Sequence, residues 1–220
     1  MRRSFGTSLR WSILRQLQEA RMADEGMTMG HLAGFKEYLD AAAQRSVFDQ
    51  ALASQQPWEL HLHGQRVVRA SVVENLTYDL KLAIASQGEE ALPKTQVKLL
   101  YPADLSAGAR GLIKVDKKIR ALGLPPMVTW KERHFVKNKT LFPLMQEAQV
   151  VFFTLLEGEV IRGIIADFSR YEITVNLKGG VPVVILRHSI YDCRNKQGRC
   201  LLKAFQDEHR DWERSPLFVS

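Results

Sequence analysis

The feature that most restricts the fold is a series of short strand-like segments in the second half of the chain. Residues 171–178 alternate apolar and polar side chains, which is typical of a strand with one buried face, and residues 150–156 form a strand-length apolar run. Turns at Glu157-Gly158 and Gly179-Gly180 separate the segments. The predicted strands are residues 150–156, 159–168, 171–178, 183–187 and 189–193, and a short predicted helix at 141–148 precedes them. Strands this short cannot bury a core in a flat sheet, so we expect a small, strongly bent antiparallel barrel.

The first half repeats this plan of a helix followed by short strands. Apolar residues at helical spacing predict a helix over residues 32–54, and Trp58, Leu60 and Leu62 then alternate with polar residues. Strand-like sequence continues at 66–73, 78–85 and 96–101. Residues 60–64 resemble residues 154–158, which predicts an internal duplication with divergent copies. The expected fold class is therefore mainly β with α, with two bent, five-stranded barrels that each follow an α-helix.

Composition divides the chain into five regions. Small residues at 103–111 and the pair Pro125-Pro126 indicate a boundary between the halves. The predicted regions are a basic N-terminal arm at 1–27, a first module at 28–108, a basic linker at 109–130, a second module at 131–200 and a tail at 201–220. Residues 8–23 predict a basic amphipathic helix and residues 201–214 a solvated helix face. The linker is either a solvated connector or an arm that follows RNA.

Charge is distributed unevenly along the chain. The net charge of +7 is the sum of +4 over residues 1–21, −3 over residues 22–110 and +6 over residues 111–220. A polyanion would therefore prefer the N-terminal arm and the second half. Because many basic proteins bind no nucleic acid, charge alone leaves the two interpretations evenly balanced.

Several classes of protein and of site are not indicated. No apolar run is long enough to span a membrane, and the basic start, residues 1–3, is not followed by the apolar region of a secretory signal, so we expect a cytoplasmic protein. Cys193 and Cys200 are expected to be reduced thiols beside a polar hairpin. His61 and His63 could share a metal, but without a third ligand we interpret them as two histidines on a wet strand face. We predict no metal, no cofactor and no catalytic residue.

An ordered set of residues between Leu141 and Asp192 resembles the Sm-like domain of the bacterial RNA chaperone Hfq. These residues are Leu141 and Leu144 in the helix, Leu156-Glu157-Gly158, Gly163, Ile165, Phe168, Tyr171 and Arg187-His188-Ser189-Ile190. The resemblance covers about a third of the chain and implies SH3-like small barrels, Sm-like in both halves. A glycine at 158 suits a turn with positive φ, and Gly163 lets the second strand bend sharply.

The resemblance implies an RNA site on the helix-bearing face, where the family binds the uridine-rich end of RNA. The candidate RNA-binding residues are Tyr171, Arg187, His188, Phe168, Lys137 and Asn138. An aromatic ring can stack on an unpaired base, while arginine and histidine offer hydrogen-bond donors. The alternative is that Tyr171 is an ordinary strand aromatic and His188 a satisfied barrel histidine.

Other positions depart from the family. Leu186 stands where the family usually has tyrosine, Met145-Gln146-Glu147 replace an arginine-rich rim used for annealing, and Thr154 and Val160 replace residues of a purine site on the opposite face. We therefore expect a non-catalytic protein that binds single-stranded, U-rich RNA in post-transcriptional regulation, as a homotrimer with six modules. The alternative is a protein-interaction scaffold that keeps the barrels without specific RNA binding.

Overall fold

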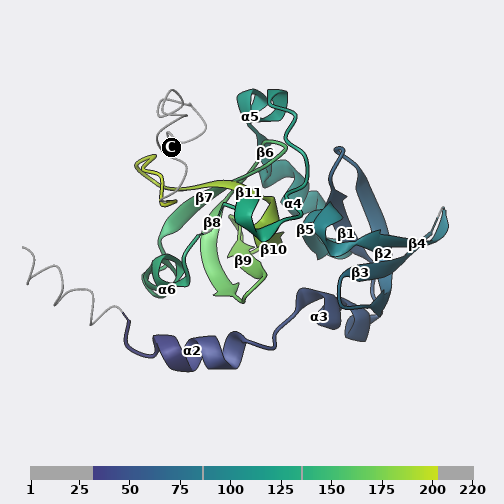
Figure 1. Cartoon of the computed structure of the whole chain (residues 1–220), viewed down its shortest axis with the longest axis horizontal. Helices are drawn as coiled ribbons and strands as arrows, with labels where there is room; N and C mark the ends of the chain where they lie inside the picture. Colours follow the sequence, from purple (N-terminus) through teal and green to yellow (C-terminus); the bar gives the residue numbers. More distant parts are fainter. Residues whose placement is uncertain (1–31, 86, 135, 203–220) are drawn as a thin grey trace, which may run out of the picture.

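The structure, a computed structural model, describes residues 32–85, 87–134 and 136–202. Eleven antiparallel strands form one continuous sheet with short helices around it (Figure 1). The predicted class, mainly β with α, is confirmed. The strands of both halves join in a single open sheet, so the two separate barrels stay a prediction.

In the first half, five strands follow helix α3 (Val47–Ser54). They are β1 (Trp58–Leu62), β2 (Val67–Asn75), β3 (Asp79–Ile84), β4 (Gly88–Pro93) and β5 (Val97–Pro102), and the 3-10 helix η1 (Lys94–Gln96) joins the last two. Their order in the sheet is β5-β1-β2-β3-β4. Strand β4 is missing from the sequence prediction because it lies at the sheet edge, where all but one of its side chains are exposed or half-buried and no apolar alternation marks it.

The second half has the same order of elements. Helix α6 (Asn138–Gln146) precedes β7 (Val150–Leu155), β8 (Glu159–Phe168), β9 (Glu172–Asn176), β10 (Pro182–Leu186), the 3-10 helix η4 (Arg187–Ser189) and β11 (Ile190–Asn195). The sheet order is β11-β7-β8-β9-β10, which repeats that of the first half. The predicted strands of this half are confirmed to within two residues at each end.

Strand register relates the halves residue by residue. One residue is left out of the pairing between the first and fifth strands of each half, Lys98 in the first and Tyr191 in the second. One is also left out between the second and third strands, Val73 and Ala166. A constant sequence offset therefore relates residues 58–102 to residues 151–195, which supports the predicted duplication.

The register corrects the alignment by one position. Gln65, and not Gly64, is equivalent to Gly158, and both have positive φ, 58° for Gln65 and 87° for Gly158. A glycine is required only at Gly158, because a Cβ atom there would clash with the backbone oxygen of Asp116.

Strands β5 and β10 pair antiparallel and join the halves, with Leu100 opposite Val184. Side chains also cross this junction. Leu99 and Tyr101 pack in the core of the second half, whereas Val184 and Leu186 pack in the core of the first. Each half therefore completes its core with residues of the other.

The single helix predicted at 32–54 is two helices. Helix α2 (Phe35–Ala42) ends before Ser46, whose side chain caps the start of α3 by accepting a hydrogen bond from a backbone N–H. Tyr38 of α2 packs against Phe168 of the second half, with ring centroids 4.8 Å apart, while α3 covers the core of the first half. The helix is interrupted because its two parts cover different cores (Figure 1).

The linker predicted at 109–130 is part of a longer, structured connector between the halves, residues 103–134. This connector contains η2 (Ala103–Leu105), α4 (Ser106–Leu112), β6 (Lys114–Val115), α5 (Lys117–Ala121) and η3 (Trp130–Glu132). Strand β6 pairs with β8, and Asp116 caps α5 by accepting from the backbone N–H of Lys118 at 2.8 Å. The connector therefore packs against the second half.

His61 of β1 and His63 just after it do not lie on a wet face, so that prediction is wrong. The side chains of His61 and His63 are 12% and 4% exposed. His61 Nε2 lies 2.9 Å from the Tyr101 hydroxyl, and His63 Nδ1 lies 3.6 Å from Glu157 of the second half. Burial lowers the pKa of both imidazoles. The alternation predicted an exposed face because the residues that cover it, Tyr101 and Glu157, are distant in sequence.

The N-terminal arm, with its predicted helix at 8–23, lies outside the described residues, as does the tail beyond residue 202. Within the described part, no helix has both the length and the apolar character needed to cross a membrane. Cys193 is buried and Cys200 half-buried, and the Cys200 thiol donates to an Asp192 carboxylate oxygen at 3.0 Å.

Candidate nucleic-acid interface

A pocket of about 270 Å³ opens between the connector and the second half. It is lined by Trp130, Arg133, Arg170, Tyr171, Arg187 and His188. Three of these residues, Tyr171, Arg187 and His188, are candidates from the sequence. The pocket therefore brings together two aromatic side chains, three arginines and a histidine.

Tyr171 lies in the tight turn between β8 and β9. The turn is closed by the Ser169 N–H, which donates to the Glu172 carbonyl at 3.0 Å. The Arg187 N–H donates to the Tyr171 carbonyl at 2.9 Å, which fixes the two residues beside each other. The Tyr171 side chain is 58% exposed, and the guanidinium of Arg170 lies 5.3 Å from its ring centroid. Tyr171 therefore offers an open aromatic face at the pocket.

Arg187 lies deeper in the pocket. Its guanidinium packs 5.6 Å from the ring centroid of Phe168, and Nη1 donates to the Val136 carbonyl at 3.2 Å. Nε and Nη2 are buried and have no hydrogen-bond partner among the residues that the structure describes. Burial lowers the pKa of Arg187 to about 10, so the side chain remains a cation at neutral pH. Within the described chain, two donors of the pocket wall are therefore buried and unsatisfied, which is unfavourable unless an acceptor reaches them.

His188 has a mainly structural position. It is 8% exposed, and its Nε2 lies 2.9 Å from the Val97 carbonyl of β5. Burial lowers its pKa to about 4, so the imidazole is neutral at pH 7. Its neighbour Ser189 donates to the Lys98 carbonyl at 2.9 Å. The turn η4 is therefore held against the first half, and His188 positions the pocket wall through Nε2.

Sequence reasoning did not select Trp130 and Arg133 as site residues. Trp130 is 64% exposed, and Arg133 anchors the connector beside it by donating to the carbonyls of Met127 at 3.2 Å and Val128 at 2.8 Å. The available signal was a tryptophan within a run of lysines and arginines, because interleaved aromatic and basic residues are typical of single-strand binding surfaces.

The other candidates do not line the pocket. Phe168 is 1% exposed and forms the floor under Arg187. Lys137 is exposed and Asn138 half-buried at the start of α6, directly after Val136. Lys137 and Asn138 therefore do not line the pocket. They adjoin it only through Val136, whose carbonyl accepts from Arg187.

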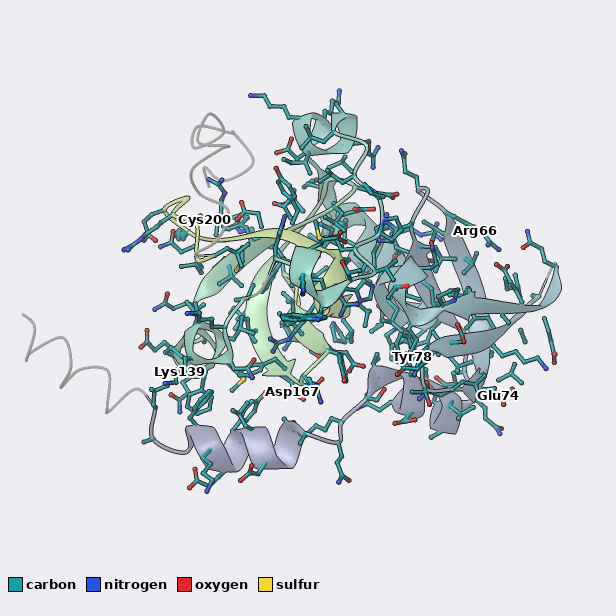
Figure 2. The ribbon with its side chains drawn as sticks, viewed as in Figure 1. Arg66, Glu74, Tyr78, Lys139, Asp167 and Cys200 are labelled. Carbon is teal, nitrogen blue, oxygen red and sulfur yellow. The ribbon has the colours of Figure 1, made fainter. Side chains whose placement is uncertain are left out.

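The first half has an equivalent pair, Tyr78 and Lys94, with different chemistry. The Lys94 N–H donates to the Tyr78 carbonyl at 2.8 Å, as Arg187 does to Tyr171, and Tyr78 is 80% exposed (Figure 2). The Lys94 ammonium, however, is bonded to the carbonyls of Leu76 and Thr77. Nearby acidic side chains include Asp49. An exposed tyrosine is thus present at this position in both halves. Among the described residues, an unpaired side-chain donor lies beside it in the second half, on Arg187, but the equivalent Lys94 is bonded.

No group of three or more His, Cys, Asp or Glu side chains in residues 32–85, 87–134 and 136–202 is arranged to hold a metal ion. Comparison of the chain with protein-family models, with curated proteins and with solved structures gives no match.

Proposed function

We propose that this protein binds single-stranded, U-rich RNA without catalysis, as a cytoplasmic post-transcriptional regulator built from two Sm-like barrels similar to those of Hfq. The observation that carries the proposal is the pocket in which exposed Trp130 and Tyr171 accompany the unpaired buried donors of Arg187. Open aromatic faces beside arginines are typical of sites that stack unpaired bases.

The donors of Arg187 also favour bases that present carbonyl oxygens, uracil and guanine, over adenine. Uracil presents two carbonyl oxygens, both acceptors, whereas the amino group of adenine or cytosine would oppose the guanidinium with another donor. Leaving the buried Nε and Nη2 unpaired costs free energy, so a ligand that supplies acceptors is preferred. Arg170 and Arg133 at the same pocket supply positive charge for the phosphates.

A second candidate function is a protein-interaction scaffold without specific RNA binding. It is favoured by Met145-Gln146-Glu147 at the end of α6, which provide no cation at the rim where the family has arginines, and by the acidic balance of residues 22–110. The two functions differ in whether the pocket residues determine RNA affinity.

For the assembly we propose a ring of three chains. Strand β4 is equivalent to β10, and β11 to β5, so pairing β4 of one chain with β11 of the next would repeat the β10–β5 junction. Leu201 N–H already donates to the Cys193 carbonyl at 2.8 Å, at the position equivalent to Leu100. Closure of the ring therefore requires residues 199–201 to move aside. The mass of the particle in solution should correspond to three chains, and a stable monomer contradicts the ring.

RNA binding is tested by fluorescence anisotropy with labelled oligo-uridine and oligo-adenosine at two salt concentrations. Tyr171→Ala and Trp130→Ala should each weaken oligo-uridine binding by about 5- to 150-fold, since stacking contributes about 1–3 kcal/mol per base. Arg187→Met, which retains packing on Phe168, should reduce the preference for uridine over adenosine.

Tyr78→Ala is the matched control, because it removes a tyrosine at the equivalent position that is even more exposed than Tyr171. It should leave the affinity within about twofold, well below the effect of one lost stacking contact. Binding that is equal for both RNAs, insensitive to the pocket variants and abolished by salt would refute the site and leave only a general basic surface.

A further inference from the structure

The connector covers the outer edge of β8 in the second half. Lys114 and Val115 of β6 pair with Val160 and Glu159, and the Asp116 N–H donates to the Gly158 carbonyl at 2.7 Å. Under this added strand Val160 is only 3% exposed. The start of β8 is thus bonded on both sides, by β7 and by β6.

The equivalent edge in the first half has no added strand. The register makes Val67 of β2 equivalent to Val160 and Gln65 equivalent to Gly158. Val67 is 46% exposed, and it pairs on one side only, with His61 of β1. Along the described chain, β3 reaches β2 only from Ala70 onward.

A groove of about 540 Å³ lies along this open edge. It runs over residues 67–71 of β2, residues 83–85 at the end of β3 and residues 87–89 at the start of β4. Figure 2 shows Arg66 at this end of the first half and Glu74 at the opposite end. The groove is larger than the pocket beside Tyr171.

Backbone groups of β2 face this groove. The Arg66 carbonyl accepts from the Leu62 N–H at 2.7 Å, so the backbone N–H and carbonyl of Arg66 point toward β1. Because hydrogen-bonding direction alternates along an antiparallel strand, the N–H and carbonyl of Val67 point to the open side. An exposed strand edge of this kind can be paired by an additional strand.

We propose that the open edge of β2 at Val67 binds an extended segment of a partner protein, which adds a strand there as β6 does on β8. The occupant is not β6, which is already paired with β8 in the same chain. Arg66 and Glu89 are neutralised by Glu90 and Lys81, whereas Arg69 has no ion pair with any described residue. The segment that fits therefore carries an acidic side chain opposite Arg69 among apolar, β-branched residues.

The test uses peptides based on the connector, because it supplies the strand that occupies the equivalent edge. The first probe is a capped peptide with the sequence of residues 111–116, and the second is its Leu112→Glu form, which places the acid opposite Arg69. The third is the second peptide N-methylated at the residue corresponding to Asp116, which removes the donor that bonds Gly158 in the connector. The acidic peptide should bind more tightly than the first, and N-methylation should weaken it.

Two variants of the whole protein test the edge itself. Val67→Pro removes the outward N–H at a position where proline is tolerated, since the β1 side is unaffected, while Val67→Thr keeps the N–H and the shape. Val67→Pro should bind the acidic peptide at least about tenfold more weakly, and Val67→Thr should bind within about twofold.

Amide chemical shifts of the wild-type protein provide a readout that needs no variant. Titration with the acidic peptide should move the signals of residues 67–71 and 83–89. The proposal is overturned if no peptide binds at millimolar concentration, if Val67→Pro and Val67→Thr bind alike, or if the shifts concentrate on β11. Displacement of the peptide by oligo-uridine would likewise overturn it, by assigning the groove to RNA.

Discussion

Replacing Lys98 with methionine is expected to destabilise the protein by about 3–5 kcal/mol, the usual loss when one partner of a buried ion pair is removed. Lys98 belongs to β5 of the first half, and its ammonium is paired with Glu157 and Glu159 of the second. Its side chain is 1% exposed and that of Glu159 is 7% exposed, so water cannot replace the lost cation. Methionine keeps most of the volume, which makes the cavity contribution small.

The loss should depend on pH. Burial raises the pKa of Glu157, but hydrogen bonds from Lys98 and from the backbone N–H groups of Gly64 and Gln65 outweigh it and hold the pKa below its usual value of 4.5. A lowered pKa stabilises the folded protein above the unfolded pKa, and this contribution is lost as the pH falls. The effect of Lys98→Met should therefore be large at pH 7.5 and smaller below about pH 4.5.

The measurement is urea unfolding at pH 7.5 of wild type, Lys98→Met, Glu159→Gln and the double variant. The double variant should lose less stability than the sum of the two single losses. With glutamine at position 159, removal of Lys98 leaves only the Glu157 carboxylate without its cation. Lys81→Met is the matched control, since its partner Glu89 is 54% exposed and such surface pairs contribute at most about 1 kcal/mol. A loss for Lys98→Met no larger than that of Lys81→Met would refute the reasoning.

Three further substitutions test other contacts. Burial raises the pKa of Glu172 to about 7, so the stability that the protonated carboxyl contributes is present below pH 4.5 and lost as the pH rises through about 7. Glu172→Gln should therefore be more stable than wild type at pH 8, by about 1–3 kcal/mol in urea unfolding. At pH 4 the two proteins should differ little. Gly163→Ala would place a Cβ 2.6 Å from Val175 Cγ1 and closer still to the Asn176 carbonyl, and thermal unfolding should show a loss of about 1–3 kcal/mol or more. Leu99→Ala should cost about 2–5 kcal/mol in urea unfolding, and equal stability would contradict the shared core.

The sequence was most informative where local chemistry decides the structure. Strand β8 begins and ends where predicted, because its alternation lies between the turn at Gly158 and the polar residues after Phe168. Arg187, His188 and Tyr171 could be predicted to lie together, since they belong to a single predicted module and its internal turns. The prediction of one helix at 32–54 was wrong because Ser46 can also start a helix. Whether the segment forms one helix or two is decided by the positions of the two cores that it covers.

Features that depend on contacts between the halves could not be predicted in this way. His61 and His63 have the alternation of an exposed face, yet His61 lies against Tyr101 of β5 and His63 against Glu157 of the second half. Trp130 lies in a stretch without periodicity, so its place beside Tyr171 follows only from the path of the connector. Strand β4 has too little burial to leave a pattern. For the histidines and Trp130, the deciding contacts come from residues far away in the sequence, whereas β4 pairs with its neighbour β3 and is missed because most of its side chains are exposed.

The pocket beside Tyr171 depends on the same contacts between the halves. Its wall at η4 is held by Val97 and Lys98, which belong to β5 of the first half, while Trp130 and Arg133 come from the connector. An isolated second half would keep Tyr171 and Arg187 but would lack the carbonyl that holds His188 and the core residues Leu99 and Tyr101. Because β5 supplies those carbonyls and those core side chains together, the duplication gives the second half a pocket wall that one module alone could not form.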